Sequence, residues 1–188
     1  MPAPSRRYTL EDYLSVEDTS AVRHEFLNGE IFAMVAGSPE HAALSAAAVA
    51  LLDARLAGRP CRRYGSELRI RVPATGLATY ADAVVIQGEP IRDPESPTHV
   101  TNPSVIVEVL GPATQAYDRG EKREHYQQIA SLGDYVLVSQ DRREIDVYTR
   151  VAADSWRRSI YGPGQTVDLP SIDVRFTVDE LYSAASVR

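Results

Sequence analysis

Asp82 and Glu108 are acids inside two segments that otherwise have the composition of buried β-strands. The segments, TYADAVVI and SVIVEVL, are nearly continuous apolar runs, as expected of central strands covered on both faces. A buried carboxylate is costly without a partner, a metal ion or a solvent-filled cleft. Either acid alone could lie at a strand end or pair with an arginine. Together, on strands close in sequence, they favour an oxygen site for Mg²⁺ or Mn²⁺ that includes a backbone carbonyl.

Lys122 is the only lysine among the 20 basic residues of the chain, and the others are all arginine. Helical spacing places it on the same face as Asp118 and the apolar-stripe residue Tyr126, so we expect its side chain to face inward. From there the ammonium can reach back over the end of the Glu108 segment. The alternative is an exposed ion pair with Asp118, which would contribute little stability and would not explain why the residue is a lysine.

Two strand carboxylates and a helix ammonium are the groups that metal-assisted hydrolysis of a phosphodiester requires. The carboxylates of Asp82 and Glu108 would hold the metal ion, which polarises the phosphate and lowers the pKa of a bound water. The ammonium of Lys122 would position that water or stabilise the negative charge that develops in the transition state. The three residues therefore indicate a site for phosphodiester hydrolysis.

The elements that must position these residues follow from capping, turn and periodicity signals. Asn28-Gly29 lies between two short β-prone runs and predicts a hairpin near the N-terminus. Thr9, Ser38 and Thr177 are the expected N-caps of three helices. Helices are expected over residues 10–16, 39–57, 118–131 and 177–184. Strands are expected over 67–72, 80–86, 104–110, 134–139, 144–150 and 155–161, with a surface loop over 87–103.

Strands that alternate with helices and are followed by hairpins indicate an α/β or α+β fold, with a mixed β-sheet flanked by helices. We expect a single domain over residues 1–188, its core over roughly 38–150, with an N-terminal β-hairpin and additional C-terminal strands. The single cysteine, Cys61, excludes an internal disulfide framework and a Cys-rich zinc site. Because no apolar run could span a membrane or form a signal core, we expect a cytoplasmic protein without membrane contact.

Short motifs in a fixed order connect this chain to a known family. They are YTLEDYL, RHEFLNGEIFAM, SPEH, YADAVVI, VEVLGPAT and DRGEK, and the match runs from Tyr8 to about Tyr148. In these motifs the chain resembles the Uma-type endonucleases of the PD-(D/E)XK, or restriction-endonuclease-like, superfamily. The resemblance implies a core of mixed β-sheet flanked by helices.

The resemblance also implies roles for individual residues. Asp82 and Glu108 would bind a divalent metal ion, Mg²⁺ or Mn²⁺, with the backbone carbonyl of Val109 as a third protein ligand. The superfamily usually has a lysine two residues after the glutamate, where this chain has Leu110. The family is expected to supply the lysine from the following helix instead, which points to Lys122. No organic cofactor is implied.

Three further residues match motif positions of the family. Glu25 corresponds to an acid that would lie near the metal, or it is a polar strand residue of the hairpin. His41 is either a neighbour of the site or a structural residue in a first helical turn, and Tyr126 either lines the pocket or packs in the core. Ala81 and Gly111 replace a proline and a serine of the family, and neither change removes a ligand.

The residues and the resemblance together predict a metal-dependent endonuclease that hydrolyses DNA, as a homodimer because duplex cleavage requires two cuts. The alternatives are hydrolysis of another phosphodiester and a catalytically silent module that derives from a nuclease or mobile element and binds nucleic acid or protein. The net charge of −6 argues against tight sequence-independent DNA binding, but it is compatible with a local basic patch. The candidate phosphate contacts, each of which could also be an ordinary solvated side chain, are Arg62, Arg63, Arg69, Arg71, Arg119 and Arg123.

Overall fold

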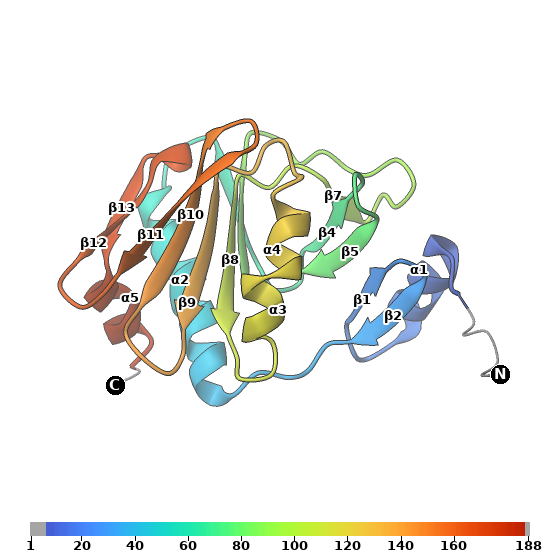
Figure 1. Ribbon diagram of the computed structural model, residues 1–188, viewed down its shortest axis with the longest axis horizontal. Coiled ribbons are helices and arrows are strands. Elements are labelled where there is room, and N and C mark those ends of the chain that lie inside the picture. The colour runs from blue at the N-terminus through green and yellow to red at the C-terminus, as the bar shows by residue number, and fades with distance from the viewer. Residues whose placement is uncertain (1–6, 187–188) are drawn as a thin grey trace.

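The computed structural model describes residues 7–186 and contains a six-stranded and a five-stranded β-sheet with helices around them (Figure 1). The six-stranded sheet has the strand order β11-β10-β9-β8-β6-β3. Its strands β8 and β9 run parallel, and its other neighbouring strands are antiparallel. The strands are β3 (Cys61–Gly65), β6 (Ala83–Gln87), β8 (Val105–Leu110), β9 (Asp134–Ser139), β10 (Ile145–Ala152) and β11 (Ser155–Tyr161).

Helices cover both faces of the six-stranded sheet. The long helix α2 lies on one face, and the short helices α3 and α4 lie on the other (Figure 1). The helices are α1 (Leu10–Thr19), α2 (Pro39–Arg55), α3 (Gln115–Arg119), α4 (Glu121–Tyr126) and α5 (Val178–Ala184). Helix α5 and the small sheet of β12 (Thr166–Leu169) and β13 (Val174–Thr177) complete the core on the α2 side. The mixed sheet flanked by helices that the sequence predicts is therefore confirmed.

Strand β8 alternates between two hydrophobic cores, because successive side chains of a strand point to opposite faces. The core on the α2 side contains Val105, Val107 and Val109. The core beside α3 and α4 contains Ile106 and Leu110. Glu108 lies between Ile106 and Leu110 on the same face of the strand, so its carboxylate points towards α3 and α4.

The five-stranded sheet has the strand order β2-β1-β5-β4-β7 and packs against α1. Its strands are β1 (His24–Leu27), β2 (Glu30–Ala33), β4 (Arg69–Val72), β5 (Leu77–Tyr80) and β7 (His99–Val100). The predicted N-terminal hairpin is confirmed, because β1 and β2 pair antiparallel across Asn28 and Gly29. Both turn residues have positive φ, 53° and 82°, as a two-residue type I′ turn requires.

Several predicted boundaries are confirmed. Thr9 and Thr177 cap α1 and α5, and each completes a capping box with the acid three residues later. Ser38 caps α2, and Pro39 is the first residue of that helix. The predicted hairpin of β9 and β10 is present as well. Helix α1 is longer than predicted, since it continues to Thr19.

The segment 80–86 is not the single strand that the sequence predicts. Tyr80 ends β5 in the five-stranded sheet, and Ala83 begins β6 in the six-stranded sheet. The chain changes sheets at Ala81 and Asp82. A nearly continuous apolar run does not indicate which sheet each half joins, because both halves are buried strands. Asp82 therefore lies in a junction between strands rather than inside one.

The helix predicted over 118–131 is also divided. Helix α3 ends at Arg119, Gly120 adopts φ −111° and ψ −105°, and α4 ends at Tyr126, well before the predicted stop at Gly133. The predicted loop over 87–103 contains the short strand β7, which pairs parallel with β4. The hairpin of β12 and β13 was not predicted, because strands of four residues separated by a turn carry a weak periodicity signal.

Within residues 7–186, no helix is long and apolar enough to cross a membrane. Residues 1–6 lie outside the described residues, and the prediction about a signal core includes them. Residues 187 and 188, the last two of the predicted domain, also lie outside the described residues. The extent of the domain stays a prediction.

His99 is completely buried beside α1, where the hydroxyl of Tyr13 lies 3.4 Å from its Nε2 atom. Burial, followed by the charges of Arg69 and Arg71, lowers the pKa of His99 to about 4 from its ordinary value of 6.5. The charges of Asp93 and Glu17 oppose that shift. Between pH 6.5 and pH 4 the unfolded chain therefore binds a proton that the folded chain excludes.

His99 is expected to remove about 2 kcal/mol of stability as the pH falls from 7 to 5, whereas Glu108, whose pKa burial raises to about 8, contributes in the opposite direction. Urea unfolding at the two pH values measures the loss. The stability of His99→Gln, which cannot titrate, is expected to rise by about 2 kcal/mol relative to the wild type between pH 7 and pH 5. His125→Gln on α4 serves as the control and is expected to behave as the wild type. An equal change of stability in His99→Gln and the wild type would contradict the assignment.

Candidate active site

Asp82 is fixed beside β8 at the point where the chain enters the six-stranded sheet. The next residue, Ala83, pairs with Val107 of β8. The Oδ2 atom of Asp82 accepts a hydrogen bond of 2.7 Å from the backbone N–H of Val109. This bond holds the carboxylate next to the residue that follows Glu108. Both acids line the same cavity.

Glu108 is buried, with 5 % of its surface exposed, and two donors from α4 contact it. The hydroxyl of Tyr126 donates a hydrogen bond of 3.0 Å to its Oε1 atom, and Nζ of Lys122 lies 3.0 Å from the same oxygen. Burial raises the pKa of Glu108 to about 8. The charge of Lys122 opposes the shift, whereas the charges of Asp118 and Asp82 add to it. The positive charge of the single lysine thus does not balance the negative charges of the acids around it.

Lys122 is buried, with 3 % of its surface exposed, and it lies among carboxylates. Its Nζ atom is 2.8 Å from Oε1 of Glu25 and 3.9 Å from Oδ1 of Asp118, and it donates a hydrogen bond of 3.2 Å to the carbonyl of Tyr80. Burial alone would lower the pKa of Lys122, but the carboxylates, with Glu108 first, raise it well above its ordinary value. The lysine is therefore protonated. Because it is buried, the alternative of an exposed ion pair with Asp118 is excluded.

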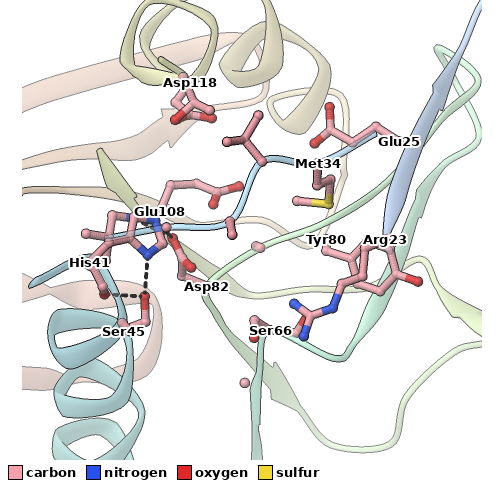
Figure 2. A pocket seen from close by; sticks show the side chains of 18 of the residues that line it. Arg23, Glu25, Met34, His41, Ser45, Ser66, Tyr80, Asp82, Glu108 and Asp118 are labelled. Atoms are coloured by element: carbon pink, nitrogen blue, oxygen red, sulfur yellow. Dashed lines mark hydrogen bonds and ion pairs between the residues drawn. The ribbon is translucent and has the colours of Figure 1, made fainter. Parts of the chain in front are cut away.

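His41 reaches the site from the first turn of α2, and its Nε2 atom lies 3.3 Å from Oδ2 of Asp82 (Figure 2). The hydrogen bond with Asp82 raises the pKa of His41; burial opposes the shift, and a bond to the backbone of Val109 adds to it. The hydroxyl of Ser45 lies 3.4 Å from Nδ1 of His41 but donates at 2.9 Å to the carbonyl of His41. That is the usual bond of a helical serine, so we assign Ser45 no nucleophilic role.

These side chains open into one cavity with a volume of about 1190 Å³, which includes residues of β2, α2, β8 and α3. Its size is at or above the range of roughly 300–1,000 Å³ that small-molecule sites usually have. Apart from the acids, much of its lining is apolar and includes Phe32, Met34, Val35 and Val49. The cavity can therefore admit a large substrate group beside the acids.

The structure brings the candidate residues from the sequence into one connected group, namely Glu25, His41, Asp82, Glu108, Val109, Lys122 and Tyr126. Their metal-binding and catalytic roles stay predictions. Glu25 is an ion-pair partner of Lys122 in the structure. Sequence reasoning missed the carbonyl of Tyr80, because a backbone acceptor leaves no signal in the residue types. It placed Asp118 on the inward helix face but assigned it no role at the site, although this residue is buried and lines the cavity.

Most arginines predicted as phosphate contacts have an acid partner in the structure. The neutralised pairs are Arg62–Glu89, Arg63–Asp53, Arg69–Asp18 and Arg71–Asp93. Because each charge is compensated locally, these strands do not form a basic surface. Arg119 and Arg123 lie on α3 and α4, on a different surface from the four others.

The oxygen donors of the site fit a hard divalent cation. Asp82, Glu108 and the carbonyl of Val109 are ligands of the kind that Mg²⁺ and Mn²⁺ prefer. The surplus of acids over the single lysine also favours a further positive charge. Among residues 7–186, no three or more His, Cys, Asp or Glu side chains form a group that could hold a metal ion. A metal here would therefore depend on the backbone carbonyl and on water as well as on the two acids.

The mixed sheet with helices on both faces places the chain in the restriction-endonuclease-like class of folds. The crystal structure of a protein from Anabaena variabilis, described as "a putative nuclease belonging to DUF820", superposes with a TM-score of 0.77. The match covers 94% of this chain and 98% of that chain at 18% identity, which shows the shared fold. Residues 10–179 match the family Uma2, described as "Putative restriction endonuclease", and the chain belongs to this family. The resemblance seen in the sequence motifs is thereby confirmed.

Two proteins of Synechocystis sp. are similar over most of the chain. The protein slr1290 is 36% identical over 180 residues, which cover 96% of this chain and 94% of that protein. The protein sll1609 is 29% identical over 154 residues, which cover 82% of this chain and 87% of that protein. Both are described as uncharacterized proteins.

Proposed function

We propose that the protein is a divalent-metal-dependent endonuclease that hydrolyses phosphodiester bonds in DNA. The observation that carries the proposal is the buried contact of 3.0 Å between Lys122 and Glu108, next to the Val109 N–H that holds Asp82. The ammonium and both carboxylates line the wall of one cavity. The family description, and the description of the Anabaena protein as a nuclease, support the same chemistry.

In this proposal, Asp82, Glu108 and the carbonyl of Val109 hold Mg²⁺ or Mn²⁺. When bound, the ion supplies polarisation of the phosphate and a more acidic water. Lys122 stabilises the negative charge that develops on the phosphate oxygens in the transition state. It can do so because the surrounding carboxylates keep it protonated, and the ion pair of 2.8 Å with Glu25 fixes its position.

Two neighbours orient the acids. The ring of His41 lies against the carboxylate of Asp82, and the hydroxyl of Tyr126 donates to Glu108. Burial raises the pKa of Tyr126 well above its ordinary value, so this hydroxyl keeps its proton. We therefore assign Tyr126 a positioning role rather than proton transfer.

The alternative is a catalytically silent module that derives from a nuclease and binds nucleic acid or protein. Burying one lysine with several acids is costly, and apolar residues of similar volume would often stabilise a fold as well or better. The structure keeps this costly group intact at a cavity, which favours catalysis over a silent role.

A plasmid-cleavage assay tests the proposal. We expect the protein to nick or linearise supercoiled DNA with Mg²⁺ or Mn²⁺ and not with EDTA. Asp82→Asn can still accept the bond from Val109, so it is expected to fold, but its rate is expected to fall on the order of 100-fold or more. DNA binding without cleavage in any metal would favour the silent module. Cleavage of bis(p-nitrophenyl) phosphate without cleavage of DNA would favour another phosphodiester substrate.

We further propose that the protein acts as a homodimer, since a two-fold axis presents two sites of matching symmetry to the two strands of a duplex. Light scattering is expected to give twice the chain mass of 20.7 kDa. A mass of one chain at all working concentrations would contradict this.

A further inference from the structure

Most arginines of the described chain are neutralised one by one. Besides the four pairs above, the pairs are Arg23–Glu67, Arg55–Glu180, Arg142–Glu144, Arg143–Asp179 and Arg175–Asp168. By contrast, Arg119 of α3 and Arg158 of β11 share the single carboxylate of Asp146. A local excess of positive charge therefore exists in a chain whose net charge is −6.

This excess of positive charge continues around the ring of Tyr148 on β10. The guanidinium carbon of Arg123 lies 5.0 Å from the centre of that ring, and that of Arg158 lies 5.7 Å from it. Tyr148 pairs with Arg158 across β10 and β11, which places both on the face that α3 and α4 cover. We call Arg119, Arg123 and Arg158 the arginine strip. Stacking on an aromatic ring holds a guanidinium plane in place and leaves its edge free to donate.

Among residues 7–186, Arg123 has no close acid partner. The acid nearest to Arg123 is Glu124, at 3.9 Å, and the side chain of Glu124 is 71% exposed. Such a distant, solvated pair contributes little. Arg123 is therefore charged, oriented and only weakly compensated.

The same two helices carry the strip and the candidate active site. Asp118 and Lys122 line the cavity, and the next residue of each helix, Arg119 or Arg123, belongs to the strip. The two surfaces are thus adjacent faces of α3 and α4. A polyanion bound along the strip would therefore contact the helices that carry Asp118 and Lys122.

We propose that the arginine strip binds the sugar–phosphate backbone of a nucleic acid and leads it to the cavity. Planar guanidinium groups donate to phosphate oxygens in pairs, which a row of three can do at successive phosphates. The inference rests on the proposed function for the identity of its ligand. It explains how an acidic chain holds a polyanion, since the positive charge is concentrated where the substrate must enter.

Fluorescence anisotropy with a labelled DNA oligonucleotide in EDTA tests the strip without cleavage. The test variant is Arg123→Gln/Arg158→Gln. It leaves Arg119 in place, so Asp146 keeps a partner. The control is Arg62→Gln/Arg142→Gln, which removes two arginines that each have an acid of their own.

We expect the test variant to bind at least tenfold more weakly, because two phosphates of the DNA are no longer neutralised, and the control to bind like the wild type. The slope of log Kd against log salt is expected to fall by roughly 0.7–0.9 for each of these phosphates. Arg158→Lys keeps the charge and is expected to retain the slope while binding more weakly, because an ammonium cannot stack and donate in pairs. Circular dichroism checks that each variant is folded.

An unchanged Kd and salt slope in the folded test variant would overturn the proposal. Equal competition by poly-glutamate and by DNA would overturn its assignment to nucleic acid in favour of an acidic protein. The outcome for cleavage is separate. If the wild type binds through the strip but cuts no DNA with Mg²⁺ or Mn²⁺, the proposed function fails and the strip stands. If the wild type and the test variant bind and cut DNA equally well, the proposal about the arginine strip is wrong and the proposed nuclease function is retained.

Discussion

Lys122→Ala is expected to lose plasmid cleavage on the order of 100-fold or more while it still binds the divalent metal. The buried ammonium lies 3.0 Å from Glu108 and 2.8 Å from Glu25, so its position is fixed before any substrate arrives. A preorganised charge of this kind acts on the transition state. The carboxylates proposed to hold the metal remain in the variant. Titration calorimetry with Mn²⁺ and the cleavage assay measure the two properties separately.

Lys122→Arg tests whether charge alone is sufficient. The site holds the lysine among Glu25, Glu108 and the carbonyl of Tyr80, in a space that a compact ammonium fills. A planar guanidinium is larger and directs its donors differently, so we expect this variant not to recover the wild-type rate. If folded Lys122→Ala cuts DNA at the wild-type rate, the lysine has no role in the reaction and the proposed mechanism is wrong.

Local signals in the sequence were sufficient for most elements of the fold. Thr9, Ser38 and Thr177 cap helices as predicted, because capping depends on residues within one turn. The change of sheets at Ala81 and Asp82 could not be read in this way. Which sheet a buried strand joins depends on distant partners, and one apolar run suits either sheet.

The candidate site was predictable in its members but not in its contacts. Acids in apolar runs and a solitary lysine identified Asp82, Glu108 and Lys122 because each is unusual for its surroundings. The ion pair between Glu25 and Lys122 joins residues far apart in sequence, and no spacing rule links them. For the same reason, sequence could not separate neutralised arginines such as Arg62 from the arginine strip, since their acid partners are brought near only by folding.

Glu108→Gln is expected to abolish cleavage and the stabilisation by Mg²⁺ without lowering the stability of the metal-free protein at pH 7. Burial raises the pKa of Glu108 to about 8 from an ordinary 4.5, so the carboxyl of the metal-free fold is largely protonated at pH 7. Glutamine resembles this neutral form, and its amide oxygen can still accept from Tyr126 and Lys122. The variant lacks only the negative charge that a cation would require.

The sign of the pH dependence follows from the raised pKa. Between pH 4.5 and pH 8 the folded chain binds a proton that the unfolded chain has lost, so ionisation of Glu108 removes stability as the pH rises through this window. The metal-free wild type is therefore expected to be less stable than Glu108→Gln at pH 9, whereas the two are similar near pH 4, where Glu108 is neutral in the folded and the unfolded chain. Glu121→Gln, an exposed change on the same helix, should behave as the wild type in both conditions.

Thermal unfolding with and without Mg²⁺ completes the test. A ligand that binds only the folded state at about 100 times its Kd stabilises it by about 2.7 kcal/mol. We expect the wild type and Glu121→Gln to gain stability with Mg²⁺ and Glu108→Gln to gain none, because one of its two carboxylate ligands is lost. An equal gain in all three proteins would show that Mg²⁺ binds elsewhere. The acids would then serve only to hold Lys122, and the metal-dependent mechanism would have to be abandoned.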